Sequence, residues 1–381
     1  MAEPLARLCL HHLEAVGVEC CGFGPDPYDP EPRHHAMAYA LYARGLVSLY
    51  RATGDVSLLQ AAEAIAQRLA DLSVGSPPGW GLPFPWQGRP SGHAYAITTA
   101  LCGHSMLELF EAGGSSLALE LLGRACSWLV DGVEWSGVDS AGAPWFAPGM
   151  PDVVVNVASQ AGGLLFAASH IVPAPRAEER GVAALRLVAD GQHGLGYWTY
   201  RPAGSQMAGA LNDSSIDAVH MAYVLDGLVT AARFGARRQL PGLRDSVASG
   251  LRFALDNLFD RTGVQVRKLV AASLDTPQER RLIEMAPEPP RYAPPRRWLA
   301  PYPGAAPLWG YGGMLGAVGR ALGAGVSELG RALPLLDRLQ AIALRRTGGR
   351  FPYSSDDAGT YPRHEAHVFD GLAAFAAVCE R

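Results

Sequence analysis

The chain has 381 residues, of which 49% are apolar and 18% are charged, and its formal net charge is −4. This length and composition are typical of a compact protein with a large buried core. The nearly balanced charge excludes a global basic field that would recruit nucleic acid or an anionic membrane surface, so we expect neither as a partner.

The cysteines and the N-terminal sequence bear on the cellular compartment. The chain has six cysteines but no CxxC pair, and its first residues lack the basic start and long apolar run of a signal peptide. No stretch of about 18 apolar residues predicts a membrane span. We therefore expect a cytoplasmic protein with free, buried thiols; disulfides or a metal site are the alternative use of the cysteines.

Apolar residues recur at helical spacing in a series of segments, which Gly-, Pro- and aromatic-rich turns separate. Helices that open with small or polar residues alternate with helices that end in these turns. The first helix is of the second kind and the last is of the first kind, so the two chain ends can complete a sixth hairpin. The predicted helices are Pro4–Val16, Arg33–Tyr50, Val56–Leu72, Gly92–Glu111, Ser116–Val130, Val153–Ser169, Glu178–Ala189, Ser214–Phe234, Leu243–Leu258, Pro307–Leu322, Val326–Arg346 and Arg363–Cys379.

This order predicts an all-α protein, an (α/α)6 toroid of six inner and six outer helices whose first and last helices close the ring. We expect one domain over residues 1–381. An open α-solenoid of hairpins is the alternative, and it needs no such match between its ends. Residues 264–306 exceed a usual connection and are rich in Pro and Arg, so we expect an insertion that is either a lid or a surface decoration.

Several motifs carry a resemblance to known proteins. The sequence QHGLGYW at Gln192–Trp198 matches the QxxxGxW repeat of the squalene-cyclase and protein-prenyltransferase toroids. The segments GWGLPFPWQ (Gly79–Gln87), VVVNVASQAGGLLF (Val153–Phe166), GYWTY and IDAVHMAYVLDGL follow one another in this order. Together they resemble the prenyltransferase-like α/α-toroid proteins encoded in bacterial exopolysaccharide gene clusters, over residues 33–375.

The resemblance implies the toroid fold and a role with saccharide chains, since related six-hairpin enzymes include glycosidases, uronate lyases and sugar epimerases. Two departures count against isoprenoid chemistry. The protonating DxDD motif of class II terpene cyclases is absent, with Asp213 and Asp217 as its nearest counterpart. The zinc ligands of protein prenyltransferases are not evident either.

In a toroid, the N-terminal ends of the inner helices face one end of the central cavity, so residues far apart in sequence converge there. Several predicted inner helices bring histidine to this position, and histidine is suited to proton transfer near neutral pH. Helix N-termini also favour an anionic ligand. The expected substrate-binding residues are His34, His35, Trp86, Arg89, His93, Asn156, Gln160, Asp213, Trp309, Tyr311 and Arg363.

The predicted catalytic pair is Asp217 and His220, which lie three residues apart near a helix start and share one face. Residues Asn212–Ser215 before them offer oxygens that can cap the helix. Asp217 can fix the tautomer of the His220 imidazole, and His364 or His367 would be the opposite proton donor or acceptor. Zinc held by these histidines is an alternative, but no HExxH motif or Cys ligand supports it, so we predict no metal and no cofactor.

The aromatic turn residues have two interpretations, because they can stack on sugar rings or tie outer helices together. We expect the structural role for Trp198 and a place in the cavity for Trp86. A glycosidase needs two carboxylates that flank the scissile bond, and Asp217 with Asp152 or Asp370 could serve.

These observations predict a soluble carbohydrate-active enzyme that uses acid–base chemistry of the lyase, epimerase or hydrolase type. The substrate would be a saccharide, expected to be anionic, bound in the central cleft. One alternative is a cyclase or transferase that acts on an isoprenoid-like natural product, where aromatic rings would stabilise cations. The other alternative is a non-catalytic saccharide-binding or scaffold protein of a biosynthetic cluster.

Overall fold

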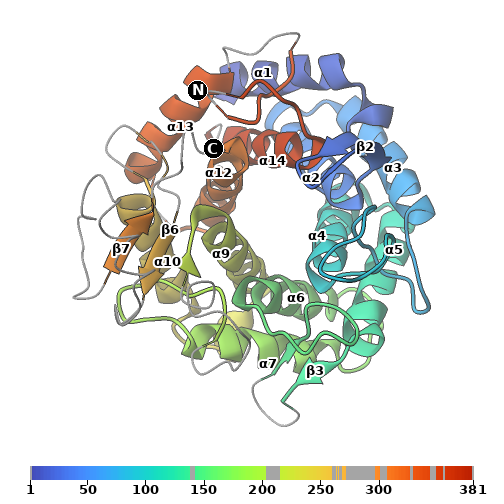
Figure 1. The fold of residues 1–381 in the computed structure, drawn as a ribbon, viewed down its shortest axis with the longest axis vertical. Helices are drawn as coiled ribbons and strands as arrows, with labels where there is room; N and C mark the ends of the chain where they lie inside the picture. The colour runs from blue at the N-terminus through green and yellow to red at the C-terminus, as the bar shows by residue number, and fades with distance from the viewer. Residues whose placement is uncertain are drawn as a thin grey trace.

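The computed structural model describes residues 2–137, 142–202, 215–259, 263, 265, 268–271, 297–300, 307–326, 329–343, 349–354 and 357–379. The helices in these ranges form two concentric rings around a central axis (Figure 1). The inner ring consists of α2 (Ala36–Thr53), α4 (Ala96–Gly113), α6 (Val155–Ala168), α9 (Ala218–Arg233), α12 (Leu308–Gly323) and α14 (Pro362–Cys379). The outer ring consists of α1 (Ala2–Val16), α3 (Val56–Asp71), α5 (Ser116–Ser127), α7 (Ala177–Asp190), α10 (Leu243–Asn257) and α13 (Leu329–Ala343).

The ring of helices is closed. Each inner helix contacts the next one, α14 contacts α2, and the N-terminal helix α1 packs on α14. The His12 imidazole of α1 connects both ends of the chain: its Nε2 lies 2.8 Å from the hydroxyl of Tyr42 in α2, and its Nδ1 lies 3.2 Å from the carbonyl oxygen of Gly349. The predicted closed toroid is therefore confirmed, and the open solenoid is wrong.

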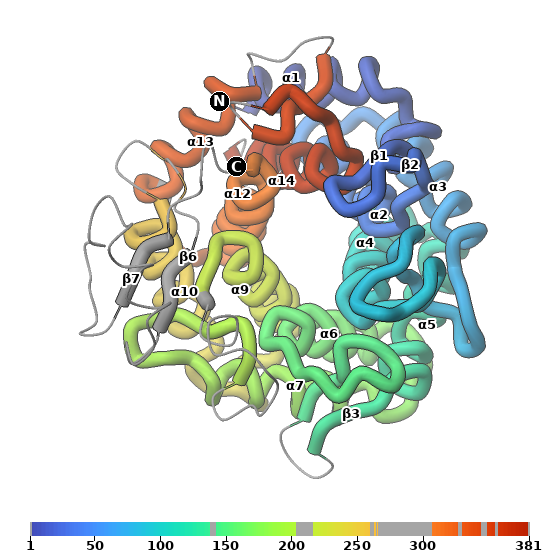
Figure 2. The backbone as a smooth tube through the Cα atoms, in the orientation of Figure 1, coloured from blue at the N-terminus to red at the C-terminus, as the bar shows by residue number. Residues whose placement is uncertain are grey.

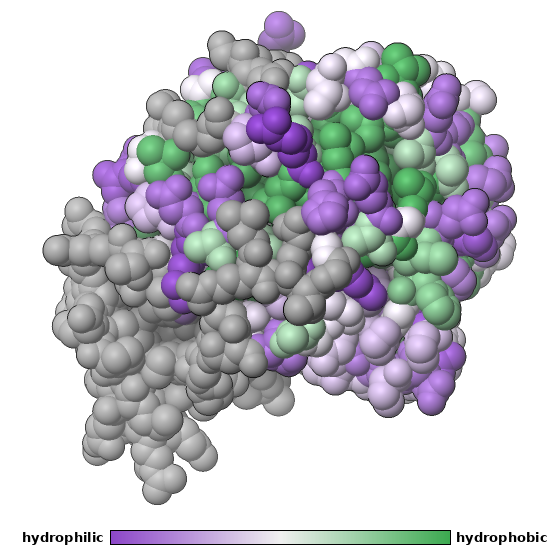
Figure 3. Space-filling model, turned by 90° about the horizontal axis from the view of Figure 1, so that it is seen from above, coloured by the Kyte–Doolittle hydropathy of each residue, from purple (hydrophilic) through white to green (hydrophobic). Residues whose placement is uncertain are grey.

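The two kinds of helix differ in burial. Helix α2 is buried on all its faces, whereas α1 buries one apolar face and exposes polar residues such as Arg7 and Glu14. The view from above in Figure 3 accordingly shows hydrophilic residues interspersed with hydrophobic ones. Small residues let the inner helices approach closely: a Cβ added to Gly163 of α6 would lie 2.2 Å from the carbonyl oxygen of Gly227 in α9.

Tryptophans in the turns fix the ends of the outer helices. The indole Nε1 of Trp198 donates to the carbonyl oxygen of Val188 at the end of α7, at 2.7 Å. Trp80 does the same for Leu69 in α3, also at 2.7 Å. Gln192 begins the QHGLGYW motif, and its Nε2 donates to the Ser246 carbonyl oxygen of α10 at 2.9 Å. The structural role predicted for Trp198 is confirmed.

The strands are short and lie in the connections. They are β1 (Phe23–Asp26) paired with β2 (Asp29–His34), β3 (Trp135–Ser136) paired with β4 (Ala143–Pro144), and the antiparallel sheet β5 (Ser215–Ile216), β6 (Lys268–Ala271) and β7 (Arg297–Ala300). Short irregular helices η1 (Val18–Cys20), η2 (Trp128–Gly132) and η3 (Ala236–Arg238) complete the elements. Figure 2 shows β1 and β2 on the near side of the ring, with the connections before α4 and α6.

The predicted start of α9 at Ser214 is wrong. Ser215 lies in β5, because its backbone pairs with Val270 of β6, and the helix begins only at Ala218 with Asp217 as its N-cap. The predicted caps Asn212, Asp213 and Ser214 lie outside the described residues, as does most of the insertion at 264–306.

Two further expectations concern the cysteines and the membrane. All six cysteines are free thiols, as predicted. Cys9, Cys21, Cys102 and Cys126 are buried as expected, whereas Cys20 is exposed and Cys379 is only partly buried. None of the helices among the described residues is long and apolar enough to cross a membrane.

A network of charged side chains crosses the ring axis. Arg44 of α2 donates to Asp226 of α9, the helix on the opposite side of the inner ring, at 2.6 and 3.1 Å. Asp226 also accepts from Arg320 of α12 at 2.5 Å and from Gln160 of α6 at 3.2 Å. The network continues through the pairs Arg44–Glu108, Arg51–Glu108, Arg233–Glu111 and Arg320–Asp370, so every inner helix takes part.

Charge pairing keeps the buried carboxylates of Asp226 and Glu108 in this network ionised. Burial alone would raise the pKa of Asp226, but the guanidinium groups of Arg320 and Arg44 outweigh it and hold the pKa well below its ordinary value. The neighbouring His104 of α4, whose Nε2 lies 3.0 Å from the Gln160 carbonyl oxygen, behaves differently. Burial, aided by the charge of Arg44, lowers the pKa of His104 to about 4, so its imidazole is neutral near pH 7.

The contact between α6 and α9 requires glycine. In Gly227→Ala the added Cβ would lie 2.3 Å from the Ser159 carbonyl oxygen, so the two helices must move apart. We expect the free energy of unfolding to fall by about 1–3 kcal/mol in urea denaturation. The matched control is Gly123→Ala in α5, where a Cβ meets nothing within 4 Å. Because alanine favours helices, this control should raise the stability by about 0.5–1 kcal/mol, and an equal rise for Gly227→Ala would contradict the close approach.

The neutral His104 predicts acid destabilisation. Its pKa of about 4 in the folded protein lies below the ordinary value of 6.5, so between these pH values the unfolded chain binds a proton that the folded chain excludes. The free energy of unfolding should fall by about 3 kcal/mol for this group as the pH decreases from 7 to 4. His104→Gln keeps a donor for Gln160 and should remove that part of the fall, measured by urea denaturation at both pH values. His11→Gln on the exposed face of α1 is the control, and equal pH dependence in both variants would refute the assignment.

Candidate functional site

A cavity of about 460 Å³ lies at the end of the ring where the inner helices begin. Every inner helix contributes to its lining from its first two turns, with Met37, Ile97, Thr98, Asn156, Val219, His220, Tyr223, Trp309 and Arg363. The connections between hairpins supply the rest of the lining, which is Tyr28, Leu82, Phe84, Trp86, Gln87, Tyr95, Phe146, Tyr200, Asp217, Pro307 and Tyr353. The N-terminal ends of the inner helices thus converge as predicted.

A repeated backbone hydrogen bond holds aromatic residues at this cavity. The first N–H group of an inner helix donates to the carbonyl oxygen of an aromatic residue in the connection that precedes the next inner helix, and that aromatic side chain lines the cavity. The bonds are Ala96 N to Phe146 O at 3.0 Å, Val155 N to Tyr200 O at 3.0 Å and Leu308 N to Tyr353 O at 2.8 Å. Each bond satisfies a helix N–H group and fixes one wall residue at the same time.

Asp217 and His220 form a hydrogen-bonded pair at the cavity wall. Asp217 caps α9, because its Oδ1 accepts from the backbone N–H of His220 at 2.9 Å. Its Oδ2 lies 2.5 Å from Nδ1 of the same histidine, whose imidazole packs edge-on against Tyr200. A carboxylate accepts, so the proton of the neutral imidazole lies on Nδ1 and the lone pair on Nε2. This arrangement leaves Nε2 able to accept a proton at the cavity.

A second hydrogen-bonded pair of side chains connects the cavity wall to α14. The Tyr223 hydroxyl lies 2.5 Å from His367 Nε2, and His367 Nδ1 lies 2.6 Å from the Arg363 carbonyl oxygen. Since a carbonyl oxygen only accepts, Nδ1 carries the proton and Nε2 accepts from the Tyr223 hydroxyl. Burial raises the pKa of Tyr223 and lowers the pKa of His367 to about 4, so both groups are neutral near pH 7. The pair therefore fixes the direction of the Tyr223 hydroxyl.

His364 lies behind the cavity wall. Its imidazole stacks on Trp309 with ring centroids 4.5 Å apart and on Tyr353 at 4.9 Å. Both of its ring nitrogens are buried without a hydrogen-bond partner in the described part of the chain. Burial, with the nearby charge of Arg363, holds the pKa of His364 well below its ordinary value, so this imidazole is neutral and supports Trp309.

Among the described lining residues, Arg363 is the one with a guanidinium group, and an acidic side chain balances its charge. Its Nε and Nη2 donate to the two oxygens of Asp26 in β1 at 2.8 and 3.0 Å. The guanidinium carbon lies 5.9 Å from the ring centroids of both Tyr28 and Trp309. This bidentate pair joins residues 337 positions apart and fixes the β1–β2 hairpin over the start of α14.

Of the predicted site residues, the structure places Trp86, Asn156, Asp217, His220, Trp309 and Arg363 in the lining. Asp213 lies outside the described residues. The residues that do not line the cavity are His34, His35, Arg89, His93, Gln160, Tyr311, His364 and His367.

The contacts of these residues explain their positions. Tyr311 is buried, and its hydroxyl accepts from the backbone N–H of Gln265. His35 lies 3.0 Å from the carbonyl oxygen of Gly24, and Arg89 donates to a backbone oxygen on the outside of the cavity. Gln160 lies one helical turn beyond Asn156 and binds the charge network. The binding and catalytic roles of all these residues remain predictions.

Two expected carboxylate partners of Asp217 lie elsewhere. Asp152 is bound by the guanidinium of Arg201 at 2.7 and 2.8 Å, and Asp370 belongs to the charge network. Neither lines the cavity. Among the described residues, no group of three or more His, Cys, Asp or Glu side chains could hold a metal ion.

The sequence analysis missed several lining residues. Tyr223 lies three residues after His220, and this spacing places both near one face of the helix. Thr98 and Tyr28 gave no signal, because their neighbours in the cavity come from remote parts of the chain.

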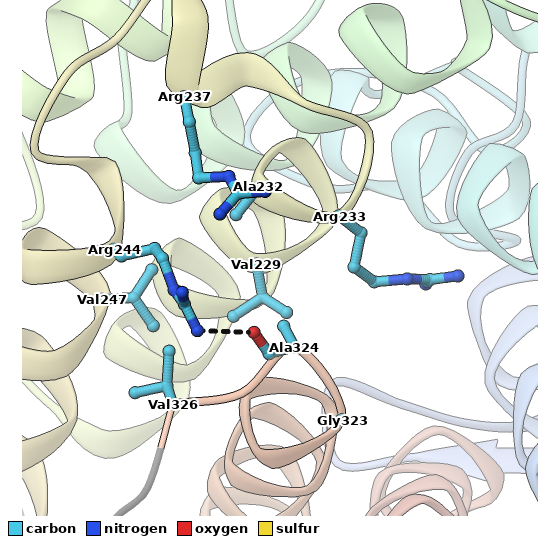
Figure 4. Close-up of a pocket in the computed structure, with 9 residues that line it drawn as sticks. All are labelled: Val229, Ala232, Arg233, Arg237, Arg244, Val247, Gly323, Ala324 and Val326. Carbon is cyan, nitrogen blue, oxygen red and sulfur yellow. Dashed lines mark hydrogen bonds between the residues drawn. The ribbon is translucent and has the colours of Figure 1, made fainter.

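A second, smaller cavity of about 270 Å³ lies at the opposite end of the ring, where α9 and α12 end. Val229, Val247 and Val326 line it together with Arg237 and Arg244 (Figure 4). Arg244 donates to the carbonyl oxygen of Ala324, as the dashed line shows. Among the described residues, its lining holds no histidine or carboxylate, so the cavity at the helix N-termini is the candidate active site.

No family model and no curated protein matches this sequence. Solved structures match its fold over nearly the whole chain. A polysaccharide lyase has a TM-score of 0.63 at 10% identity, covering 100% of this chain and 98% of its own. An inactive α-1,6-mannanase variant from Salegentibacter sp. HEL1_6, in complex with α-1,6-mannotriose, has a TM-score of 0.65 at 10% identity, covering 99% and 100%. Cellobiose 2-epimerase from Bacillus thermoamylovorans B4167 has a TM-score of 0.60 at 11% identity, covering 92% and 91%. At these identities the likeness shows the α/α-toroid fold.

Proposed function

We propose that this protein is a carbohydrate-active enzyme that uses acid–base chemistry on a saccharide bound in the cavity at the helix N-termini. The observation that carries the proposal is the Asp217–His220 pair at the cavity wall. Asp217 fixes the imidazole by a 2.5 Å hydrogen bond to Nδ1, so Nε2 acts as the proton acceptor. The structural neighbours support this class, because their names describe a polysaccharide lyase, a mannanase and an epimerase.

The lining of the cavity suits a sugar. Flat aromatic faces can pack on the apolar faces of sugar rings, while scattered polar groups can bind hydroxyls. The aromatic lining residues are Tyr28, Phe84, Trp86, Tyr95, Phe146, Tyr200, Tyr223, Trp309 and Tyr353. The polar ones include Gln87, Thr98 and Asn156.

The geometry favours proton transfer at carbon over hydrolysis by two carboxylates. Among the described lining residues, Asp217 is the one with a carboxylate. Asp152 and Asp370 do not line the cavity and are bound by arginines. In a lyase or epimerase, His220 Nε2 would take the proton from a carbon next to a carbonyl or carboxylate group. The Tyr223 oxygen would accept a hydrogen bond from a substrate hydroxyl, so that His367 acts through Tyr223 as a positioning residue.

An anionic saccharide remains part of the proposal. The N-termini of the inner helices face the cavity, and their dipoles favour negative charge, including charge that develops during proton removal. Arg363 is already paired with Asp26, so the helix N-termini are the more effective source of this potential. The resemblance to exopolysaccharide-cluster proteins makes a bacterial exopolysaccharide or its precursor the first substrate class to test.

The two alternatives fit the cavity less well. A cyclase for an isoprenoid would use the aromatic walls, but Asn156, Thr98 and the Asp217–His220 pair put polar groups in the same space. A pure scaffold would leave the Nε2 of His220 without a role. Both alternatives stay open to the experiment below.

His220 should be essential for turnover. Oligosaccharides with and without uronate units, α-1,6-mannotriose among them, would be assayed for new reducing ends, for absorbance of an unsaturated product and for epimers by NMR. On the substrate so found, His220→Ala should lower kcat by about 10²–10⁴-fold, because the proton acceptor is lost.

Matched variants separate catalysis from folding. Asp217→Asn keeps an N-cap side chain but releases the tautomer of His220, so kcat should fall with little change in stability. His11→Ala replaces an exposed histidine of α1 and should keep full activity. Full activity of His220→Ala would contradict the catalytic assignment.

A further inference from the structure

Two polar side chains in the lining of the candidate active-site cavity, which we call its floor, are buried and have polar atoms without partners among the described residues. Thr98 of α4 and Asn156 of α6 line this cavity, and their side chains are 0% and 5% exposed. Neither Thr98 Oγ1 nor Asn156 Oδ1 has a hydrogen-bond partner in the described part of the protein. A buried polar atom that stays unpaired destabilises the protein, so a ligand that pairs with it gains affinity.

The charge network closes the ring beneath this floor. On α2 the lining residue Met37 and the network residue Arg44 lie seven residues apart, which corresponds to about 10 Å along the helix. Arg44 reaches across the axis to Asp226, and Gln160 joins them from α6. The fully buried Gln160 and His104 fill the level between floor and network. A saccharide therefore cannot pass through the ring.

We infer that the cavity binds one end of a saccharide chain, with hydroxyls of the terminal sugar at Thr98 and Asn156. This inference rests on the proposed function and adds the mode of binding to it. A closed floor stops a chain that enters from the mouth, so the terminal unit is the part that reaches the buried polar atoms. A sugar hydroxyl both donates and accepts, which matches the acceptor Oδ1 and the hydroxyl of Thr98.

The size of the cavity agrees with this mode. Its volume of about 460 Å³ lies in the lower part of the range for small-molecule sites and accommodates roughly one or two sugar rings. The Asp217–His220 pair and Tyr223, at the N-terminal end of α9, line the same cavity. The reaction would then take place at the terminal unit or at its linkage to the next one.

The first test measures which end of a saccharide can be modified without loss of binding to the protein. Neutral and uronate-bearing oligosaccharides of two to six units, including α-1,6-mannotriose, would be screened by native mass spectrometry. Each bound oligosaccharide would be compared with a form capped at its reducing end by 2-aminobenzamide and a form extended by one unit at its other end. We expect one modification to abolish binding and the other to be tolerated. If both are tolerated, or both abolish binding, the inference is overturned.

The second test uses the floor residues. Thr98→Val keeps the shape and removes a hydroxyl that has no partner in the protein, so it should weaken binding roughly tenfold without lowering the melting temperature. Asn156→Ala should also weaken binding at least tenfold. Ser105→Ala is the matched control, since Ser105 lies two turns deeper on α4 and its hydroxyl donates to the Cys102 carbonyl oxygen.

The outcomes separate this inference from the proposed function. Unchanged affinity in Thr98→Val and Asn156→Ala, with His220→Ala inactive, overturns the terminal-sugar mode and leaves the enzyme class in place. A lower melting temperature for Thr98→Val also contradicts the inference, because the hydroxyl would then be serving the fold. Absence of binding to every oligosaccharide overturns both the inference and the proposed saccharide substrate.

Discussion

The Arg44–Asp226 ion pair determines how the central space of this ring of helices is divided. It joins opposite inner helices across the axis, and both side chains are buried. Removing Asp226 would leave Arg44 paired only with Glu108, and removing Arg44 would leave Asp226 paired only with Arg320, so either loss would unbalance the buried charges. Arg320, Glu108 and Gln160 complete its hydrogen bonds. The central space is therefore divided, and the candidate active-site cavity remains at the end where the inner helices begin.

The residues of α9 connect this network with the candidate chemistry. Asp217, His220, Tyr223 and Asp226 follow one another at intervals of three residues. Each step turns by about 60° around the helix, so successive side chains point to different neighbours. His220 borders the cavity, Tyr223 binds His367 of α14, and Asp226 binds the arginines at the axis. One helix thus holds both the proposed proton acceptor and an acidic residue that joins the charge network at the axis.

The sequence predicted the architecture because turns and helix starts alternate, and this alternation extends to both chain ends. It did not predict which polar residues reach the cavity. Inner helices are buried on every face, so their pattern offers no polar face that distinguishes the cavity side from the helix–helix contacts. His220 lines the cavity while His364 and His367 lie behind the wall, although all three occupy the first two turns of an inner helix. Long-range ion pairs such as Asp26–Arg363 determine which of these side chains face the cavity.

The fold also explains why the buried histidines are neutral. In the low-dielectric wall, desolvation and nearby arginines keep His364 and His367 neutral, and a neutral imidazole can stack on Trp309 or accept from Tyr223 without a counter-charge. A protonated imidazole there would add positive charge beside Arg363, which already uses Asp26. His220 differs because it is partly exposed and its Nδ1 is hydrogen-bonded to the carboxylate of Asp217. Of these three histidines, His220 is the one that lines the cavity, so the proposed acid–base role falls on α9 and the proposed positioning role on α14.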